Sequence, residues 1–148
     1  MVLLVIPALA AMNLPEPTGY VVDTTGTLKP ETVSYLTNTC KDFDSKGKAQ
    51  IAVCVVNSTQ PYSIEQWSIK LAEKWKVGYK GIDNGAILVW AKGDRKVRLE
   101  VGRGTEALIT DAEANRIVND VIIPCFKKGD FDDGMVAGLE AIKKEVNK

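Results

Sequence analysis

The chain has 148 residues, of which 45% are hydrophobic and 26% charged, and its 19 basic side chains equal its 19 acidic ones. This composition is typical of one globular domain with a buried core, and it excludes a disordered or collagen-like chain. A formal net charge of +0 supplies no basic field for DNA or RNA and no polybasic patch for a membrane surface. We therefore expect no nucleic-acid partner.

Histidine is absent from the sequence. This absence removes the usual general base near neutral pH and a common zinc ligand, which excludes the Ser-His-Asp, Cys-His and HExxH chemistries. Cys40, Cys54 and Cys125 lie far apart without a CxxC motif, so neither a zinc knuckle nor a thioredoxin-like redox site is predicted. Cys54 lies in an apolar run and is interpreted as a small buried hydrophobic residue.

Residues 1–12 form an uncharged apolar stretch that resembles the hydrophobic region and cleavage site of a secretory signal peptide. The stretch is too short to cross a bilayer, and no basic residue precedes it. We interpret it as a leader remnant, with a packed or disordered apolar tail as the alternative. Residues 13–19 contain two prolines and a glycine, so the predicted division is a leader and linker over 1–19 and a domain over 20–148.

The first half of the domain is predicted to contain two strands joined by a helix. A short strand is expected at 20–22. A helix follows over 29–45, with Pro30 in its first turn and Gly47 at its end. Residues 49–57 are apolar on both alternating faces, which is typical of a central strand covered by helices on both sides.

A second helix and a hairpin come next. The helix is predicted over 63–75 because Ser63 and Gln66 have the spacing of a capping box and apolar residues recur along one stripe. Residues 86–91 form another apolar strand, and 96–101 alternate apolar and charged side chains after a tight turn. This pattern predicts an antiparallel hairpin with one half-exposed strand.

Two helices complete the predicted order. Thr110 and Glu113 offer a second capping box for a helix that Pro124 is expected to end, and 135–146 carry apolar residues at helical spacing. The order of elements predicts an α/β fold, a three-layer α/β/α sandwich with a mixed sheet of about four or five strands and about four helices.

The candidate site follows from the geometry of the hairpin. The loop that enters its first strand and the loop that leaves its second must emerge at the same edge of the sheet. The first loop carries Asp83 and Asn84, and the second carries Glu106 and Asp111. Oxygen ligands without histidine or cysteine suit a hard cation, and flexible loops suit calcium better than magnesium. We therefore expect a Ca²⁺ site formed by these four side chains.

Two other interpretations of the same residues stay open. Asp83 and Asn84 could form only a tight turn, and Asp111 could be there only because a carboxylate is favourable at a helix N-terminus. Arg103 and Lys80 could hold a phosphate beside the cation, or they could be solvated surface residues.

Five segments together resemble the TPM domain family, which is named after plant thylakoid lumen, photosystem repair and nematode receptor-modulator proteins and is common in bacterial envelope proteins. The segments are YVVDTTGTL (20–28), QIAVCVV (50–56), SIEQWS (63–68), KWKVGYKGIDNGAILVWAKGDRKVRLEVGRGTEALITD (74–111) and IIPCFKKGDFDDG (122–134). Their order and spacing carry the resemblance, which runs from about residue 20 to 142.

The resemblance implies an α/β/α sandwich, an extracytoplasmic location and a calcium site at a loop edge. It also implies a signal peptide and a membrane segment in many members; the sequence shows no such segment before Lys148, so either a tail was removed or this member is soluble. Asp83, Glu106 and Asp111 match acidic positions of the family's motifs. Asp23 matches another, but we expect it at the opposite edge in a turn or cap, unless the first strand is antiparallel to its neighbour.

These observations support three functional hypotheses. The first is a calcium-binding extracytoplasmic module, monomeric, that binds or maintains other envelope or membrane proteins. The second is a slow metal-dependent acid phosphatase, an activity described for plant members of the family, with Asp83 or Glu106 as the catalytic candidate that handles the proton. The third is a purely structural domain that binds no metal.

Overall fold

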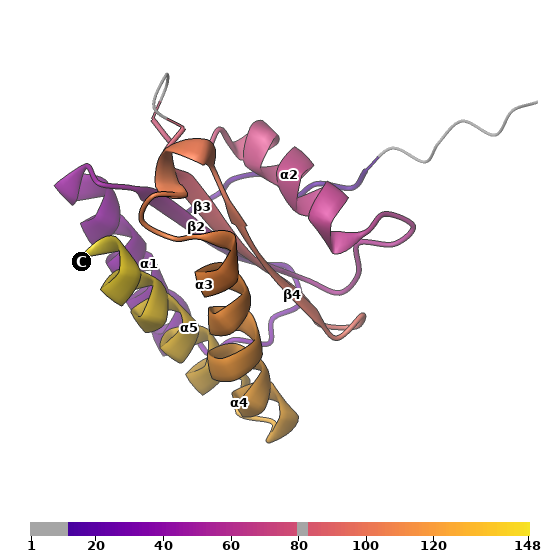
Figure 1. The fold of residues 1–148 in the computed structure, drawn as a ribbon. Coiled ribbons are helices and arrows are strands. Elements are labelled where there is room, and N and C mark those ends of the chain that lie inside the picture. Colours follow the sequence, from indigo (N-terminus) through magenta and orange to yellow (C-terminus); the bar gives the residue numbers. More distant parts are fainter. Residues whose placement is uncertain (1–11, 80–82) are drawn as a thin grey trace, which may run out of the picture.

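The computed structural model of the protein describes residues 12–79 and 83–148. Within these residues the strands form one sheet in the order β1-β2-β3-β4, with helices on both faces (Figure 1). The strands are β1 (Val21–Asp23), β2 (Gln50–Val56), β3 (Gly85–Ala91) and β4 (Lys96–Val101). The first three are parallel, and β4 pairs antiparallel with β3. The predicted α/β/α sandwich around a mixed sheet is confirmed.

The two faces of the sheet carry separate hydrophobic cores. The helices are α1 (Pro30–Lys46), α2 (Ile64–Trp75), α3 (Asp111–Arg116), α4 (Ile123–Lys127) and α5 (Phe131–Val146), with a π-helical segment η2 (Ile117–Ile122) between α3 and α4. One core lies between the sheet and α1, α5 and the α3-η2-α4 run, and the other lies under α2 (Figure 1). Val53 belongs to the first core and its neighbour Cys54 to the second, as the pleat of a strand requires.

The two crossover connections have opposite hands. The strands β1, β2 and β3 are parallel and lie side by side in sequence order. The helix of the first crossover, α1, covers one face, whereas the helix of the second, α2, covers the other. Two steps in one direction across a sheet have the same hand only when both helices lie on the same face. One crossover therefore departs from the nearly universal right-handed rule.

The predicted helix ends are largely confirmed. Gly47 follows α1 with φ 69°, a left-handed conformation that glycine adopts without a Cβ penalty, and its N–H bonds to the Asp44 carbonyl. At α2, Ser63 and Gln66 make both bonds of the predicted capping box. At α3, the Thr110 hydroxyl accepts a hydrogen bond from the N–H of Glu113, which is half of the second predicted box.

The expectation that Pro124 ends the third helix is wrong. The helical path runs from Asp111 through η2 and α4 to Lys127. Pro124 lies in the first turn of α4, where its missing N–H costs least, and the wider turns of η2 directly precede it. The local change of helix type thus removes the conflict between proline and the preceding turn.

The loops that join the strands lie at the two ends of the sheet, which we call the entry edge and the exit edge. At the entry edge β3 begins at Gly85 and β4 ends at Val101; at the exit edge β1, β2 and β3 all end. Before β1, the segment from Met12 packs along α2, where the indole Nε1 of Trp75 donates to the Pro15 carbonyl at 2.8 Å. Across 12–79 and 83–148, no helix combines the length and apolarity that a membrane span requires.

Candidate functional site

The two loops predicted to meet at the entry edge do meet there. The N–H of Gly102 donates to the Gly85 carbonyl at 2.8 Å, and the N–H of Gly104 donates to the Asp83 carbonyl at 2.9 Å. The Thr105 hydroxyl adds a bond of 3.2 Å to the Gly85 carbonyl. The loop after β4 is therefore held directly against Asp83 and the first residue of β3.

Asp83 is exposed and has φ 55°, a left-handed conformation that aspartate tolerates better than most residues. Its Oδ2 accepts a hydrogen bond of 3.3 Å from the N–H of Arg103. The close approach depends on Gly102, because a Cβ at that position would lie 2.4 Å from the Asp83 carbonyl oxygen and 2.9 Å from its Oδ1. The carboxylate is thus fixed against the following loop while remaining open to solvent.

Asn84 is only 4% exposed. Its Oδ1 accepts from the N–H of Tyr79 at 2.8 Å, and its Nδ2 donates to the Lys48 carbonyl at 3.0 Å. Both groups of the amide are engaged with the backbone, so in this conformation Asn84 positions the loop around Asp83.

Glu106 and Asp111 are exposed and lie on the segment that follows Gly104. The N–H of Glu106 bonds to the Arg103 carbonyl, and Asp111 is the first residue of α3. Over the described ranges 12–79 and 83–148, no three carboxylate, thiol or imidazole side chains are gathered closely enough to hold a metal ion. The predicted ligands therefore share one edge without converging. The predicted phosphate ligand Lys80 lies outside the described residues, and Arg103 is exposed beside Asp83.

A hydrogen-bonded cluster around one carboxylate, Asp44, holds the segment that leads to the entry edge; the sequence pattern gave no sign of it. Asp44, near the end of α1, accepts hydrogen bonds from the hydroxyls of Tyr20 and Tyr79, the latter at 2.5 Å, and from Nε2 of Gln50 at 3.5 Å. Gln50 Oε1 in turn accepts from the N–H of Gly78 at 2.8 Å. The segment that leads to Asp83 is thereby tied to α1 and to β2.

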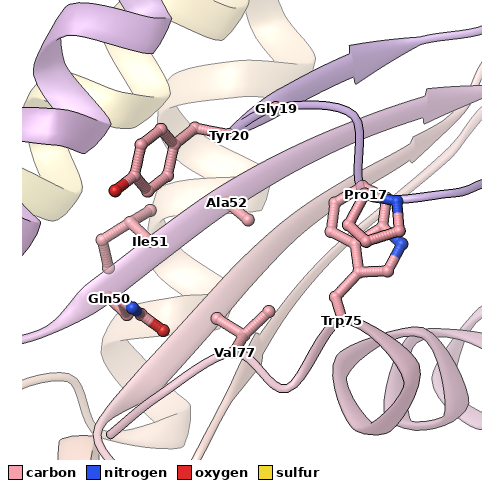
Figure 2. Close-up of a pocket in the computed structure, with 8 residues that line it drawn as sticks. All are labelled: Pro17, Gly19, Tyr20, Gln50, Ile51, Ala52, Trp75 and Val77. Atoms are coloured by element: carbon pink, nitrogen blue, oxygen red, sulfur yellow. The ribbon is translucent and has the colours of Figure 1, made fainter.

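Two members of the cluster, Tyr20 and Gln50, line a cavity of about 280 Å³ next to α2. Figure 2 shows Tyr20 and Gln50 toward one side of the cavity and Pro17 with Trp75 toward the other. The lining is mostly apolar, and the polar groups of Gln50 are already bonded within the chain. The cavity therefore offers few free polar groups for a ligand.

The cluster shifts the ionisation of its members. The hydroxyls of Tyr20 and then Tyr79 hold the pKa of Asp44 below its ordinary value. The hydrogen bond to Asp44, followed by burial, raises the pKa of Tyr79 to about 12, and the pKa of Tyr20 is raised for the same reasons. Asp44 is thus an ionised acceptor that the two phenols stabilise.

Asp23 lies at the exit edge, because β1 runs parallel to β2. Its Oδ1 accepts from the N–H and hydroxyl of Thr25 at 2.9 and 2.6 Å, and its Oδ2 accepts from the N–H of Leu28 at 2.9 Å. Asp23 therefore organises the turn after β1, away from the Asp83 loop, as the parallel alternative predicted.

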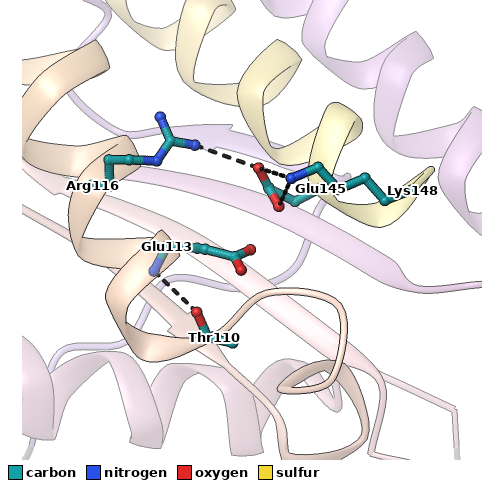
Figure 3. Close-up of polar contacts among 5 residues, drawn as sticks. All are labelled: Thr110, Glu113, Arg116, Glu145 and Lys148. Carbon is teal, nitrogen blue, oxygen red and sulfur yellow. Dashed lines mark hydrogen bonds and ion pairs between the residues drawn. The ribbon is translucent and has the colours of Figure 1, made fainter.

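A second carboxylate group joins α3 to α5 (Figure 3). Glu145 is 5% exposed and pairs with Nζ of Lys148 at 3.0 Å and Nη2 of Arg116 at 3.4 Å. The neighbouring carboxyl group of Glu113, followed by the ammonium of Lys148, lowers the pKa of Glu145. This group links two helices and lies apart from the Asp83 loop.

Comparison with solved structures finds the same fold in bacterial proteins. The N-terminal domain of a protein from P. gingivalis is 27% identical, with a TM-score of 0.81 over 92% of this chain and 94% of that one. The N-terminal domain of a protein from Corynebacterium glutamicum is 19% identical, with a TM-score of 0.68 over 90% and 84%. The BA42 protein of the psychrophilic Bizionia argentinensis is 18% identical, with a TM-score of 0.67 over 80% and 81%.

A search of curated proteins finds no match. The sequence model of the TPM domain, by contrast, matches residues 21–145, which include every described strand and nearly all of α5. The match spans both loops of the entry edge and the turn held by Asp23. The chain belongs to the TPM domain family.

Proposed function

We propose that this chain is a calcium-binding domain that acts outside the cytoplasm as a monomer and binds other envelope or membrane proteins. The observation that supports the proposal is the position of Asp83. Its exposed carboxylate is fixed at the entry edge, directly beside the loop whose continuation carries Glu106 and Asp111. Carboxylate oxygens from loops are the ligands that Ca²⁺ accepts in variable geometry.

In this proposal, calcium binding draws the carboxylates of the two loops at the entry edge together. Asp83 is the fixed ligand, and Glu106 or Asp111 must move toward it, because these carboxylates do not converge in the described residues. Ordering a loop lowers the affinity, since part of the binding free energy offsets lost chain entropy. A site of this kind suits the millimolar calcium met by extracellular modules, which is the reason for the proposed location.

A thermal melt of the purified chain tests the proposal. We expect the melting temperature to rise with added CaCl₂ relative to chelator, because a ligand that binds only the folded state stabilises it by about 2.7 kcal/mol at a hundred times its Kd. The Asp83→Asn variant keeps the shape of the side chain and one acceptor oxygen but removes the charge, so it should lose the calcium response.

Asp133→Asn is the matched control, because Asp133 is an exposed aspartate in the first turn of α5 and the variant makes the same change of charge. It should respond to calcium as the wild type does. A wild-type chain whose melting temperature is the same in calcium and in chelator would contradict the proposal. An undiminished response in Asp83→Asn would contradict the assignment of Asp83.

The second candidate function is a slow metal-dependent phosphatase. It is favoured by Arg103, an exposed residue whose own backbone N–H bonds to the Asp83 carboxylate. In such a reaction a water would attack the phosphorus and the ester P–O bond would break. Asp83 or Glu106 would accept the proton of the water and pass it to the leaving oxygen, which departs as the alcohol, and Arg103 would offset the developing negative charge.

Turnover of p-nitrophenyl phosphate separates the two functions. Metal-dependent release of nitrophenol that is lost in both Asp83→Asn and Arg103→Gln would support the phosphatase. A calcium response in the melt without any turnover supports the binding module alone.

A further inference from the structure

A second and larger cavity opens at the exit edge, opposite the Asp83 loop. Its volume is about 920 Å³, within the range of pockets that bind small organic molecules. The segment after β1 supplies Thr25 and Thr27, and the residue after β2 is Asn57. The chain leaving β1 turns to one face of the sheet and the chain leaving β2 to the other, since α1 and α2 lie on opposite faces. A crevice at the carboxyl ends of diverging strands is the usual ligand position in open α/β sheets.

One wall of this cavity is aromatic. Trp90, at the end of β3, lies with its ring centroid 4.3 Å from that of Phe126 and 5.2 Å from that of Phe131, and the two phenyl rings are 5.6 Å apart. Trp90 is 2% exposed, whereas both phenylalanines are partly exposed. The accessible part of this wall is therefore formed by Phe126 and Phe131, which pack against Trp90.

The rim of the cavity is cationic. Lys92, Arg95 and Lys127 line it, and all three are exposed. The ammonium of Lys92 donates to the Thr27 hydroxyl at 3.1 Å and lies 5.4 Å from the centroid of the Phe131 ring. Throughout 12–79 and 83–148, no carboxylate forms an ion pair with any of these cations.

Two acidic groups that lie close to the cavity in sequence are engaged elsewhere. Asp23 is bonded to Thr25 and to the N–H of Leu28. Asp94 accepts from the Ser58 hydroxyl at 2.8 Å and from the N–H of Thr59 at 3.0 Å. None of these residues except Thr25 lines the cavity. Asp130 and Asp132 flank Phe131 in sequence, and Asp132 accepts a hydrogen bond from the N–H of Lys29 at 2.8 Å. The described residues that line the cavity include three cations and no carboxylate, so the field at the rim favours an anion.

The geometry points to a binding site for an organic anion that carries a carboxylate on an aromatic group. The aromatic group packs on Phe126 and Phe131, and the carboxylate bonds to Lys92 and Arg95 at the rim. The guanidinium of Arg95 can form a bidentate pair with a carboxylate, and the Lys92 ammonium lies between the rim and the aromatic wall. This site lies at the other edge of the sheet from the proposed calcium loop and does not depend on it.

Titration followed by ¹⁵N–¹H NMR tests the inference, with 4-biphenylacetate as the probe and the uncharged 4-biphenylacetamide as its neutral counterpart. We expect the acid to shift the amide signals of Gly93, Phe126 and Phe131. The neutral probe 4-biphenylacetamide should bind about tenfold more weakly than the acid, because it cannot form the charge-assisted hydrogen bond of the carboxylate. The variant with both Lys92→Gln and Arg95→Gln should bind the acid about tenfold more weakly as well.

Lys144→Gln is the matched control, because Lys144 is a basic residue in the last turn of α5 and does not line the cavity. It should bind the acid as the wild type does, and the exposed positions of Lys92 and Arg95 leave the fold of the double variant intact. The inference would be overturned if the wild type bound 4-biphenylacetate and 4-biphenylacetamide with equal affinity. It would also be overturned if the double variant bound 4-biphenylacetate as tightly as the wild type does. The inference would also be overturned if about 5 mM 4-biphenylacetate shifted no signal, because the binding free energy would then be weaker than about 3 kcal/mol.

Discussion

The hydroxyl of Tyr79 donates a hydrogen bond of 2.5 Å to the carboxylate of Asp44, and it also reaches the Asp44 carbonyl at 2.7 Å. The two residues are 35 positions apart in sequence. Through the Tyr79 backbone this contact continues to the loop, because the Tyr79 carbonyl accepts from the N–H of Asp83 at 3.1 Å. The end of α1 thus helps to set the position of the Asp83 loop.

Replacing Tyr79 with phenylalanine should weaken this link. We expect Tyr79→Phe to lower the free energy of unfolding by about 1.5 kcal/mol, the usual contribution of a hydrogen bond to a charged acceptor. Urea unfolding measures the change. Tyr35→Phe is the control, since Tyr35 is 44% exposed and its hydroxyl bonds to Glu140 on the surface. A loss in Tyr79→Phe no larger than that in Tyr35→Phe would contradict the role of Tyr79.

The stability of the protein should fall on acidification in a way that depends on Asp44. The pKa of Asp44 is lower in the folded chain than in the unfolded one, because the hydroxyls of Tyr20 and Tyr79 stabilise its charged form. The resulting stability is present above the unfolded pKa and is lost as the pH falls through the folded pKa. In Asp44→Asn this part of the acid dependence should disappear from the melting temperature measured against pH. If the melting temperatures of the wild type and of Asp44→Asn fell in the same way with decreasing pH, this role of Asp44 would be refuted.

The phenol of Tyr79 should ionise at a higher pH than an ordinary tyrosine. Its pKa is raised from 10.0 to about 12 by the hydrogen bond to Asp44. The stability linked to this shift is complete below the ordinary tyrosine pKa and is lost as the pH rises through the folded value of about 12. Tyrosinate absorbance of the folded protein should therefore show a late-titrating phenol that is missing in Tyr79→Phe. If that variant retains the full late phase, the raised pKa belongs to another tyrosine.

The contact of Gly102 with Asp83 predicts a sharp intolerance of any side chain. Gly102 has φ −70° and ψ 158°, which alanine adopts freely, so backbone strain plays no part. An alanine Cβ would nevertheless lie 2.4 Å from the Asp83 carbonyl oxygen. We expect Gly102→Ala to cost about 1–3 kcal/mol in urea unfolding, as overpacking does.

Gly19→Ala serves as the control for that experiment, since its nearest contact would be the Val21 carbonyl oxygen at 3.9 Å. It should be close to neutral. Equal stability of the two alanine variants would show that the loop after β4 can move away from Asp83 without cost.

The cysteines should differ in reactivity. Cys40 and Cys54 are both 0% exposed, and burial raises the pKa of each thiol to about 12. Cys125 is partly exposed on α4. Because the thiolate is the reactive form, a disulfide reagent should label one thiol rapidly in the folded protein and all three after unfolding in urea. Rapid native labelling that persists in Cys125→Ser would contradict this assignment.

The sequence is sufficient to predict most of the fold because its signals are local. The apolar run of β2 and the capping box at Ser63 each determine one element, and both are confirmed. The opposite hands of the two crossovers have no local signal, since the face that each helix covers depends on packing across the whole sheet. The continuation of the helix past Pro124 was missed for a related reason, because the wider turns of η2 leave no recognised sequence pattern.

The site was only partly predictable. Antiparallel pairing alone brings the Asp83 loop and the loop after β4 to one edge, and the structure agrees. Whether carboxylates on those loops converge depends on side-chain and loop conformation, which spacing does not fix. The Asp44 cluster joins residues from α1 and two distant segments, and a lone aspartate at the end of a helix gives no warning of it.

The π-helical turns of η2 also set the rotation of everything that follows them in the helix. A π turn contains about one residue more than an α turn, and each residue turns a helix by about 100°. If the same residues formed a regular α-helix instead, Phe126 would be rotated by about 100° away from Trp90. The π-helical turns thus absorb the extra residue and keep α4 turned toward Trp90. One continuous helical run therefore begins after the loop that contacts Asp83 and ends in the wall of the exit-edge cavity.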